Sequence, residues 1–246
     1  MRSKAAINTS APISLPAAML AIAAIVSYQI LLIALIFLRP DLDPAWHTIS
    51  EWAIGPYGWL MSTAFLISGL GYAALFLMLL PEVQGAMGRI GMGILLVCVT
   101  GAFGVGVFTT DPMPIRPPLS TTGTLHVIFG TSQLMLLPFA ALLINLNLAR
   151  RNQRWARARR MLLWTAGLPL LGFGGFALYS AIFVFPMGTE AYGPGVNIGW
   201  PPRFAFFTYM LWVVTLSRQG IRCNRVANRE QQRGQTRIFS ENTTAA

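Results

Sequence analysis

The chain contains two histidines, and each lies near hydroxyl or carboxylate side chains at one end of a long apolar stretch. His47, Ser50 and Glu51 follow the first apolar stretch, Asp111 follows the third, and His126 lies inside the fourth. His47 and Glu51 are four positions apart, so on a helical segment they project from the same side with Ser50 beside them. His126 is the titratable residue placed well inside an otherwise uncharged stretch. An ionisable group at membrane depth is by default a functional candidate.

Two kinds of chemistry suit these residues. In the first, His47, Asp111 and His126 bind zinc and leave a position for a water molecule, which the metal would activate for hydrolysis with Glu51 or Ser50 assisting. In the second, Ser50 is a nucleophile, a histidine is its base, and a carboxylate orients the histidine. Both hypotheses require segments that are distant in sequence to converge.

Purely structural roles are the alternative for the same residues. His47 and Glu51 would be hydrated groups at the membrane interface, and Asp111 would cap a helix end or pair with Arg116. His126 would donate one hydrogen bond to a neighbouring span, as buried polar groups commonly do. The sequence leaves these alternatives open.

Aromatic and cationic residues near the same positions indicate a ligand site. Residues 39–59 combine acidic, histidine and aromatic side chains, and aromatic rings suit the headgroup level of a membrane. We expect Trp46, Tyr57 and Arg203 to contact a lipid headgroup or another small ligand. The connection 185–202, which carries glycines and aromatic residues, is a candidate lid.

The composition predicts which elements position these groups. Hydrophobic residues make up 54% of the chain, charged residues make up 11%, and the mean hydropathy is +0.57. Long uncharged runs without alternation predict transmembrane helices, since a membrane span must satisfy its own backbone hydrogen bonds. The fold expected is an all-α integral membrane protein, a bundle of six transmembrane helices. The six stretches are Pro16–Leu38, Tyr57–Leu80, Ile90–Thr110, Leu119–Ala149, Met161–Thr189 and Phe204–Ser217.

The distribution of cationic residues predicts the orientation. Of the 18 Lys and Arg residues, only Arg39, Arg116 and Arg203 fall on the side that carries the candidate site. Because cytoplasmic segments near spans are enriched in Lys and Arg, both termini are predicted to be cytoplasmic. We expect a cytoplasmic segment 1–15, a six-helix domain 16–217 and a basic cytoplasmic tail 218–246. The tail is either a helix that continues the sixth span or a solvated segment.

The net charge of +10 is therefore interpreted as a topology signal, with no nucleic-acid partner. Membrane lipids are the expected partners, with anionic headgroups at the basic cytoplasmic segments. The expected location is the cytoplasmic (inner) membrane of a prokaryote.

Short motifs on successive stretches carry a family resemblance. The strings are His-Thr-Ile-Ser-Glu at 47–51, Gly-Pro-Tyr-Gly-Trp-Leu-Met at 55–61, Phe-Thr-Thr-Asp at 108–111 and Gly-Thr-Leu-His at 123–126. Over roughly residues 17 to 217 the chain resembles the domain of unknown function 998 family of prokaryotic membrane proteins. The resemblance points to Ser50, Glu51, Asp111 and His126 and implies no activity. A fainter likeness to alkaline-ceramidase-like membrane hydrolases implies zinc, although this chain lacks their third histidine.

The leading functional interpretation is a multi-pass membrane protein with an outward-facing polar pocket for a lipid headgroup or small ligand. The first alternative is a metal-dependent hydrolase of a lipid amide or ester at the outer interface, with zinc as cofactor. The second alternative is a transporter or sensor.

Overall fold

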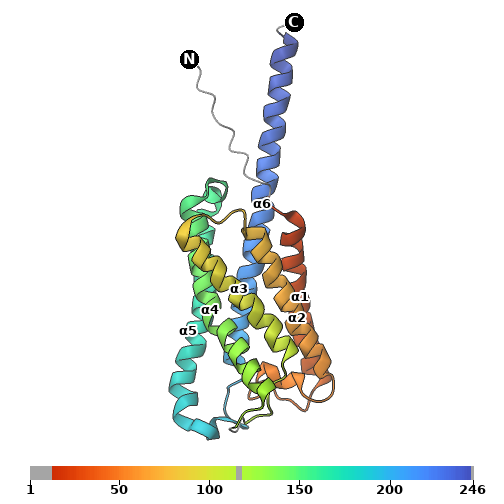
Figure 1. Cartoon of the computed structure of the whole chain (residues 1–246), viewed down its shortest axis with the longest axis vertical. Helices are drawn as coiled ribbons and strands as arrows, with labels where there is room; N and C mark the ends of the chain where they lie inside the picture. Colours follow the sequence, from red (N-terminus) through yellow and green to blue (C-terminus); the bar gives the residue numbers. More distant parts are fainter. Residues whose placement is uncertain (1–12, 115–117, 245–246) are drawn as a thin grey trace.

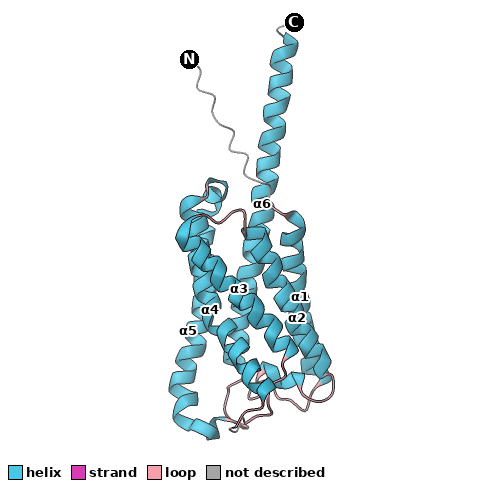
Figure 2. Cartoon of the chain, in the orientation of Figure 1, coloured by secondary structure: helices cyan, strands magenta, loops and turns pink. Residues whose placement is uncertain are grey.

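The protein is described by a computed structural model that covers residues 13–114 and 118–244, and it contains helices but no strand within these ranges. Arg116 therefore lies outside the described residues. Within these ranges six α-helices form the framework (Figure 2). Short 3₁₀ or π turns lie in three of the five connections between them. The α-helices are α1 Leu15–Leu38, α2 Gly58–Leu79, α3 Gly85–Val107, α4 Thr121–Arg151, α5 Arg159–Tyr179 and α6 Trp200–Thr244.

Five helical segments among the described residues are long and apolar enough to cross a membrane. They correspond to α1, α2, α3, α4 and α5, the last extended at both ends by short turns. The prediction of an all-helical protein with multiple spans is confirmed. The sixth predicted stretch forms the first part of α6, which continues without interruption through the basic tail to Thr244.

The helices run roughly side by side, and their connections gather at two ends (Figure 1). We call one end the site end; it holds residues 39–57, 108–114, 118–120 and 185–199 (Figure 1). We call the other the basic end; it holds residues 80–84 and 151–158, and α6 projects beyond it (Figure 1). The candidate residues before α2 and before or early in α4 thus lie at the end opposite the arginine-rich connection.

Close helix packing joins α3 to α4. A side chain at Gly104 would collide with the ring of Phe129, and one at Gly101 would lie 2.9 Å from the Phe129 carbonyl oxygen. Small residues at such positions allow helix backbones to approach closely in a membrane protein. This packing holds α4 against the bundle just beyond His126.

A buried amide joins three helices in the half of the bundle nearer the basic end. Asn145 of α4 is fully buried and donates from Nδ2 to the Leu162 carbonyl oxygen of α5 at 2.8 Å and to Thr165 Oγ1 at 3.1 Å. Its Oδ1 accepts a hydrogen bond from the Trp212 indole N–H of α6 at 3.1 Å. These bonds tie α6 to the apolar helices by directional contacts as well as by packing.

A buried carboxylate organises the basic end. Glu82 is 2% exposed and accepts hydrogen bonds from Arg154 Nη1 at 2.6 Å, Asn152 Nδ2 at 2.8 Å and Trp155 Nε1 at 2.8 Å. All three donors belong to the connection between α4 and α5, whereas Glu82 lies between α2 and α3. The carboxylate therefore fixes the two connections of this end to each other.

Candidate functional site

The start of α4 determines where His126 lies. Ser120 caps the helix: its Oγ accepts a hydrogen bond from the Gly123 N–H at 2.9 Å. Asp111, which follows α3, accepts from the Ser120 N–H at 2.9 Å and from Ser120 Oγ at 2.6 Å. Asp111 thus fixes the register at which α4 begins, and His126 follows in the second turn with 5% of its surface exposed.

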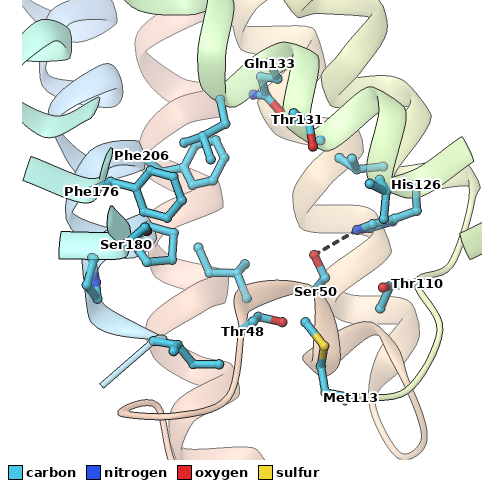
Figure 3. Close-up of a pocket in the computed structure, with 18 of the residues that line it drawn as sticks. Thr48, Ser50, Thr110, Met113, His126, Thr131, Gln133, Phe176, Ser180 and Phe206 are labelled. Atoms are coloured by element: carbon cyan, nitrogen blue, oxygen red, sulfur yellow. Dashed lines mark hydrogen bonds between the residues drawn. The ribbon is translucent and has the colours of Figure 1, made fainter. Parts of the chain in front are cut away.

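The imidazole of His126 is hydrogen-bonded at both nitrogens. Its Nδ1 lies 2.7 Å from the carbonyl oxygen of Phe108, and its Nε2 lies 2.8 Å from Ser50 Oγ (Figure 3). A carbonyl oxygen only accepts, so Nδ1 carries the proton and donates to Phe108. In the neutral ring Nε2 then has the free lone pair, and the Ser50 hydroxyl donates to it. The ring of Phe65 packs edge-on against the imidazole at 6.2 Å between centroids.

Ser50 reaches this position because residues 48–53 fold into a short turn, the 3₁₀ helix Ile49–Ala53. The carboxylate of Glu51 is 8% exposed, accepts from the Thr48 backbone N–H and lies 3.0 Å from His47 Nδ1. The i, i+4 pair predicted from the spacing is present in this turn. Glu51 and His47 stabilise the turn, and neither makes a hydrogen bond to His126 among the described contacts.

Two arginines hold the connection between α1 and α2 in place. Arg39 is 7% exposed and donates from Nη1 to the carbonyl oxygens of Ile54 at 2.8 Å and Pro56 at 3.0 Å. Its other donors bind Asp41, and these hydrogen bonds lower the pKa of the Asp41 carboxyl below its usual value. The segment that carries Ser50 is thereby pinned at the end of α1.

Arg203 connects the same segment to α6. Its Nη1 donates to the carbonyl oxygens of Pro44 at 3.1 Å, His47 at 2.8 Å and Gly199 at 2.8 Å. The guanidinium carbon lies 4.3 Å from the centre of the buried Trp52 ring, a cation–π contact. Arg203 therefore joins the segment 39–57 to the residues at the start of α6.

A cavity of about 390 Å³ lies against the Ser50–His126 pair. Thr48, Ser50, Thr110 and His126 form one wall, and Phe176 and Phe206 lie across from them (Figure 3). Further lining comes from the end of α5, the following π turn Ser180–Val184 and the connection to α6, including Ser180, Tyr192 and Ile198. The wall that contains Ser50 and His126 is therefore hydrogen-bonding, and the opposite wall is largely aromatic, with Ser180 beside Phe176 (Figure 3).

The remaining predicted residues lie apart from this pair. Trp46 stacks on His47 with ring centroids 3.7 Å apart, and Tyr57 is 47% exposed at the start of α2 with a left-handed backbone (φ 60°). Neither lines the cavity. Among the described residues, no three His, Cys, Asp or Glu side chains lie close enough together to hold a metal ion. The ligand set of the zinc hypothesis, His47, Asp111 and His126, is thus not assembled by these side chains.

Several groups that complete the site carry no signal in the sequence. The Phe108 carbonyl oxygen is a backbone atom, and Phe176 and Phe206 resemble the many other apolar residues of their helices. The motif Phe-Thr-Thr-Asp at 108–111 did include Phe108 and Thr110, and it was the one available clue that the end of α3 belongs to the site.

The fold and site together define a class, a helical multi-pass membrane protein with a cavity at one end of the bundle. Within that class the chain belongs to the family described as protein of unknown function (DUF998), whose model matches residues 21–219. The resemblance noted in the motifs is confirmed. No curated protein and no solved structure matches the chain.

Proposed function

We propose that α6 is a sixth membrane span, that both ends of the chain are cytoplasmic and that the site end faces outward. Support comes from the packing of α6 against α1 and α5 and from its buried bond between Trp212 and Asn145. The arginine-rich connection 151–158 at the opposite end agrees with the enrichment of cations in cytoplasmic segments. The basic end then contacts anionic lipid headgroups of a prokaryotic cytoplasmic membrane.

We propose further that the cavity binds an amphiphilic ligand, a lipid or a lipid fragment, at the outer side of the membrane. The observation that carries this proposal is the division of the cavity into a hydrogen-bonding wall at Ser50 and His126 and an aromatic wall at Phe176 and Phe206. An amphiphile satisfies both walls at once, because its polar group meets the hydroxyls while its chain covers the rings.

The volume of the cavity limits the size of the ligand it can hold. Sites for small molecules occupy about 300–1,000 Å³, and this cavity of about 390 Å³ lies near the lower limit. It accommodates a headgroup with the first part of one chain, and the rest of a longer chain would extend into the bilayer. A single-chain lipid with an uncharged polar end is the simplest candidate, since no carboxylate or cationic side chain among the described residues lines the cavity.

The test uses the purified full-length protein in detergent and a monoacylglycerol with an oleoyl chain as probe. Saturable binding should raise the unfolding temperature, and a probe at 100 times its dissociation constant stabilises by about 2.7 kcal/mol. Thr131→Trp fills the cavity from α4 and should abolish the shift. Ile128→Trp is the matched control, because Ile128 lies on the same helix, is 57% exposed and does not line the cavity.

Two results would oppose the proposal. One is the absence of any saturable shift in the wild-type protein with single-chain lipids of differing headgroups. The other is an equal shift in wild type and Thr131→Trp, which would place the probe elsewhere on the apolar surface.

A further inference from the structure

We infer that Ser50 and His126 form a nucleophile–base pair that hydrolyses an ester of the amphiphile bound in the cavity, without a metal. This inference rests on the proposed ligand binding, since the same cavity would present the ester to Ser50. It assigns to the site a reaction class, acyl transfer from an ester to water.

The protonation state of the pair suits this chemistry. Because Nδ1 of His126 donates to the Phe108 carbonyl oxygen, the lone pair of Nε2 faces Ser50 Oγ at 2.8 Å. A serine hydroxyl becomes a nucleophile when an adjacent base within about 2.6–3.2 Å can take its proton. The distance and the tautomer both match that requirement in the absence of ligand.

A third group holds the base in position. In serine hydrolases a carboxylate accepts from the far ring nitrogen and orients the imidazole. Here the backbone carbonyl of Phe108 takes that place at 2.7 Å, and the ring of Phe65 packs against the imidazole. The carbonyl carries a partial charge, so it stabilises an imidazolium less than a carboxylate would. This favours reactive esters over amides as substrates.

Ser50 is also reachable from the cavity. Ser50 and His126 both line it, and the aromatic wall at Phe176 and Phe206 lies opposite (Figure 3). An acyl chain packed on the aromatic wall would bring its ester carbonyl toward the hydroxyl wall. A hydrogen bond that served only to join the loop to α4 would not need to border a ligand-sized cavity.

The reaction balances with groups on the protein, the ester and water. Ser50 Oγ attacks the ester carbonyl carbon as its proton passes to His126 Nε2, and the C–O bond to the alcohol then breaks as that proton passes to the leaving oxygen. Water attacks the resulting acyl-serine, gives a proton to His126, and the proton returns to Ser50 Oγ as the fatty acid leaves. No oxidant, reductant or metal is consumed.

The test is covalent labelling with an alkyl fluorophosphonate, which Ser50 would attack at phosphorus with loss of fluoride. The full-length protein in detergent is incubated with the probe, and the adduct is located by peptide mass spectrometry. We expect an adduct on Ser50 and none in Ser50→Ala. His126→Asn should slow labelling by about 10²–10⁴-fold, the usual contribution of a general base. Asn retains an amide donor toward the Phe108 carbonyl oxygen but has no base.

Ser132→Ala is the control, because Ser132 lies on α4 and donates only to the Phe129 carbonyl oxygen of its own helix. It should label at the wild-type rate. Labelling of Ser50 at equal rates in wild type and His126→Asn would overturn the inference. So would the absence of a Ser50 adduct in protein that still shows the saturable monoacylglycerol shift, a result that would leave ligand binding intact. Loss of both the shift and the adduct would remove the proposed function as well.

Discussion

The buried bond between Asn145 and Trp212 provides a direct test of where α6 packs. Asn145 Oδ1 accepts from Trp212 Nε1 at 3.1 Å, and both residues are fully buried. Hydrogen bonds between helices in membrane proteins contribute about 0.6 kcal/mol on average and up to about 1.7 kcal/mol. Because both groups are fully buried, the contribution of this bond should lie in the upper part of that range.

The experiment is a double-mutant cycle with Asn145→Leu and Trp212→Phe. Asn145→Leu alone removes three hydrogen bonds, to the Leu162 carbonyl oxygen, Thr165 Oγ1 and Trp212. We expect it to lower the free energy of unfolding by about 1–3 kcal/mol. Trp212→Phe removes one bond and part of an aromatic surface. The double variant should lose less than the sum of the single variants by about 0.6–1.7 kcal/mol, because the shared bond is counted twice.

The measurement is reversible unfolding in mixed micelles with increasing sodium dodecyl sulfate. Asn147→Leu combined with Trp212→Phe is the control pair, since Asn147 lies on the same helix but bonds to the Gln84 backbone. Those two changes should be additive within about 0.3–0.5 kcal/mol. A coupling of zero for Asn145 and Trp212 would refute this contact, which is one of the supports for a sixth span.

Two further predictions concern the ends of the bundle. Glu82→Ala should destabilise the protein by about 3–5 kcal/mol in the same unfolding assay, because it removes the buried carboxylate that pairs with Arg154 and leaves the donors of Asn152 and Trp155 facing a buried gap. Glu82→Gln keeps one acceptor and should cost less. Equal stability of Glu82→Ala and wild type would contradict this role. At the site end, hydrogen bonds from Arg39 lower the pKa of Asp41 in the folded protein. The stability that these bonds contribute is therefore fully present above the pKa of Asp41 in the unfolded chain, and it is lost as the pH falls through the lower pKa of the folded protein. The decrease in melting temperature at acid pH should therefore be smaller in Asp41→Asn than in wild type. An equal decrease in the two proteins would contradict a stabilising role for the Arg39–Asp41 pair.

Part of the site was predictable because it depends on local features. His126 stands out as an ionisable residue within an apolar stretch, and the His47–Glu51 pair follows from a spacing of four residues. A capping role for Asp111 is compatible with its position after the third apolar stretch, and Asp111 holds the start of α4 through Ser120. The metal hypothesis needed three distant segments to bring their ligands to one point, and spacing within a segment carries no information about that.

The sequence by itself determined the class of the protein, five of its spans and the end of the bundle where polar residues gather. These follow from hydropathy and charge, because each span in lipid must satisfy its backbone within its own helix. Only the tertiary structure decided that Ser50 meets His126 across 76 positions, that the Phe108 carbonyl oxygen fixes the tautomer, and that α5 and α6 supply the aromatic wall. Those contacts depend on how each helix is rotated and shifted against its neighbours. The packing of side chains from all the helices together determines these rotations and shifts.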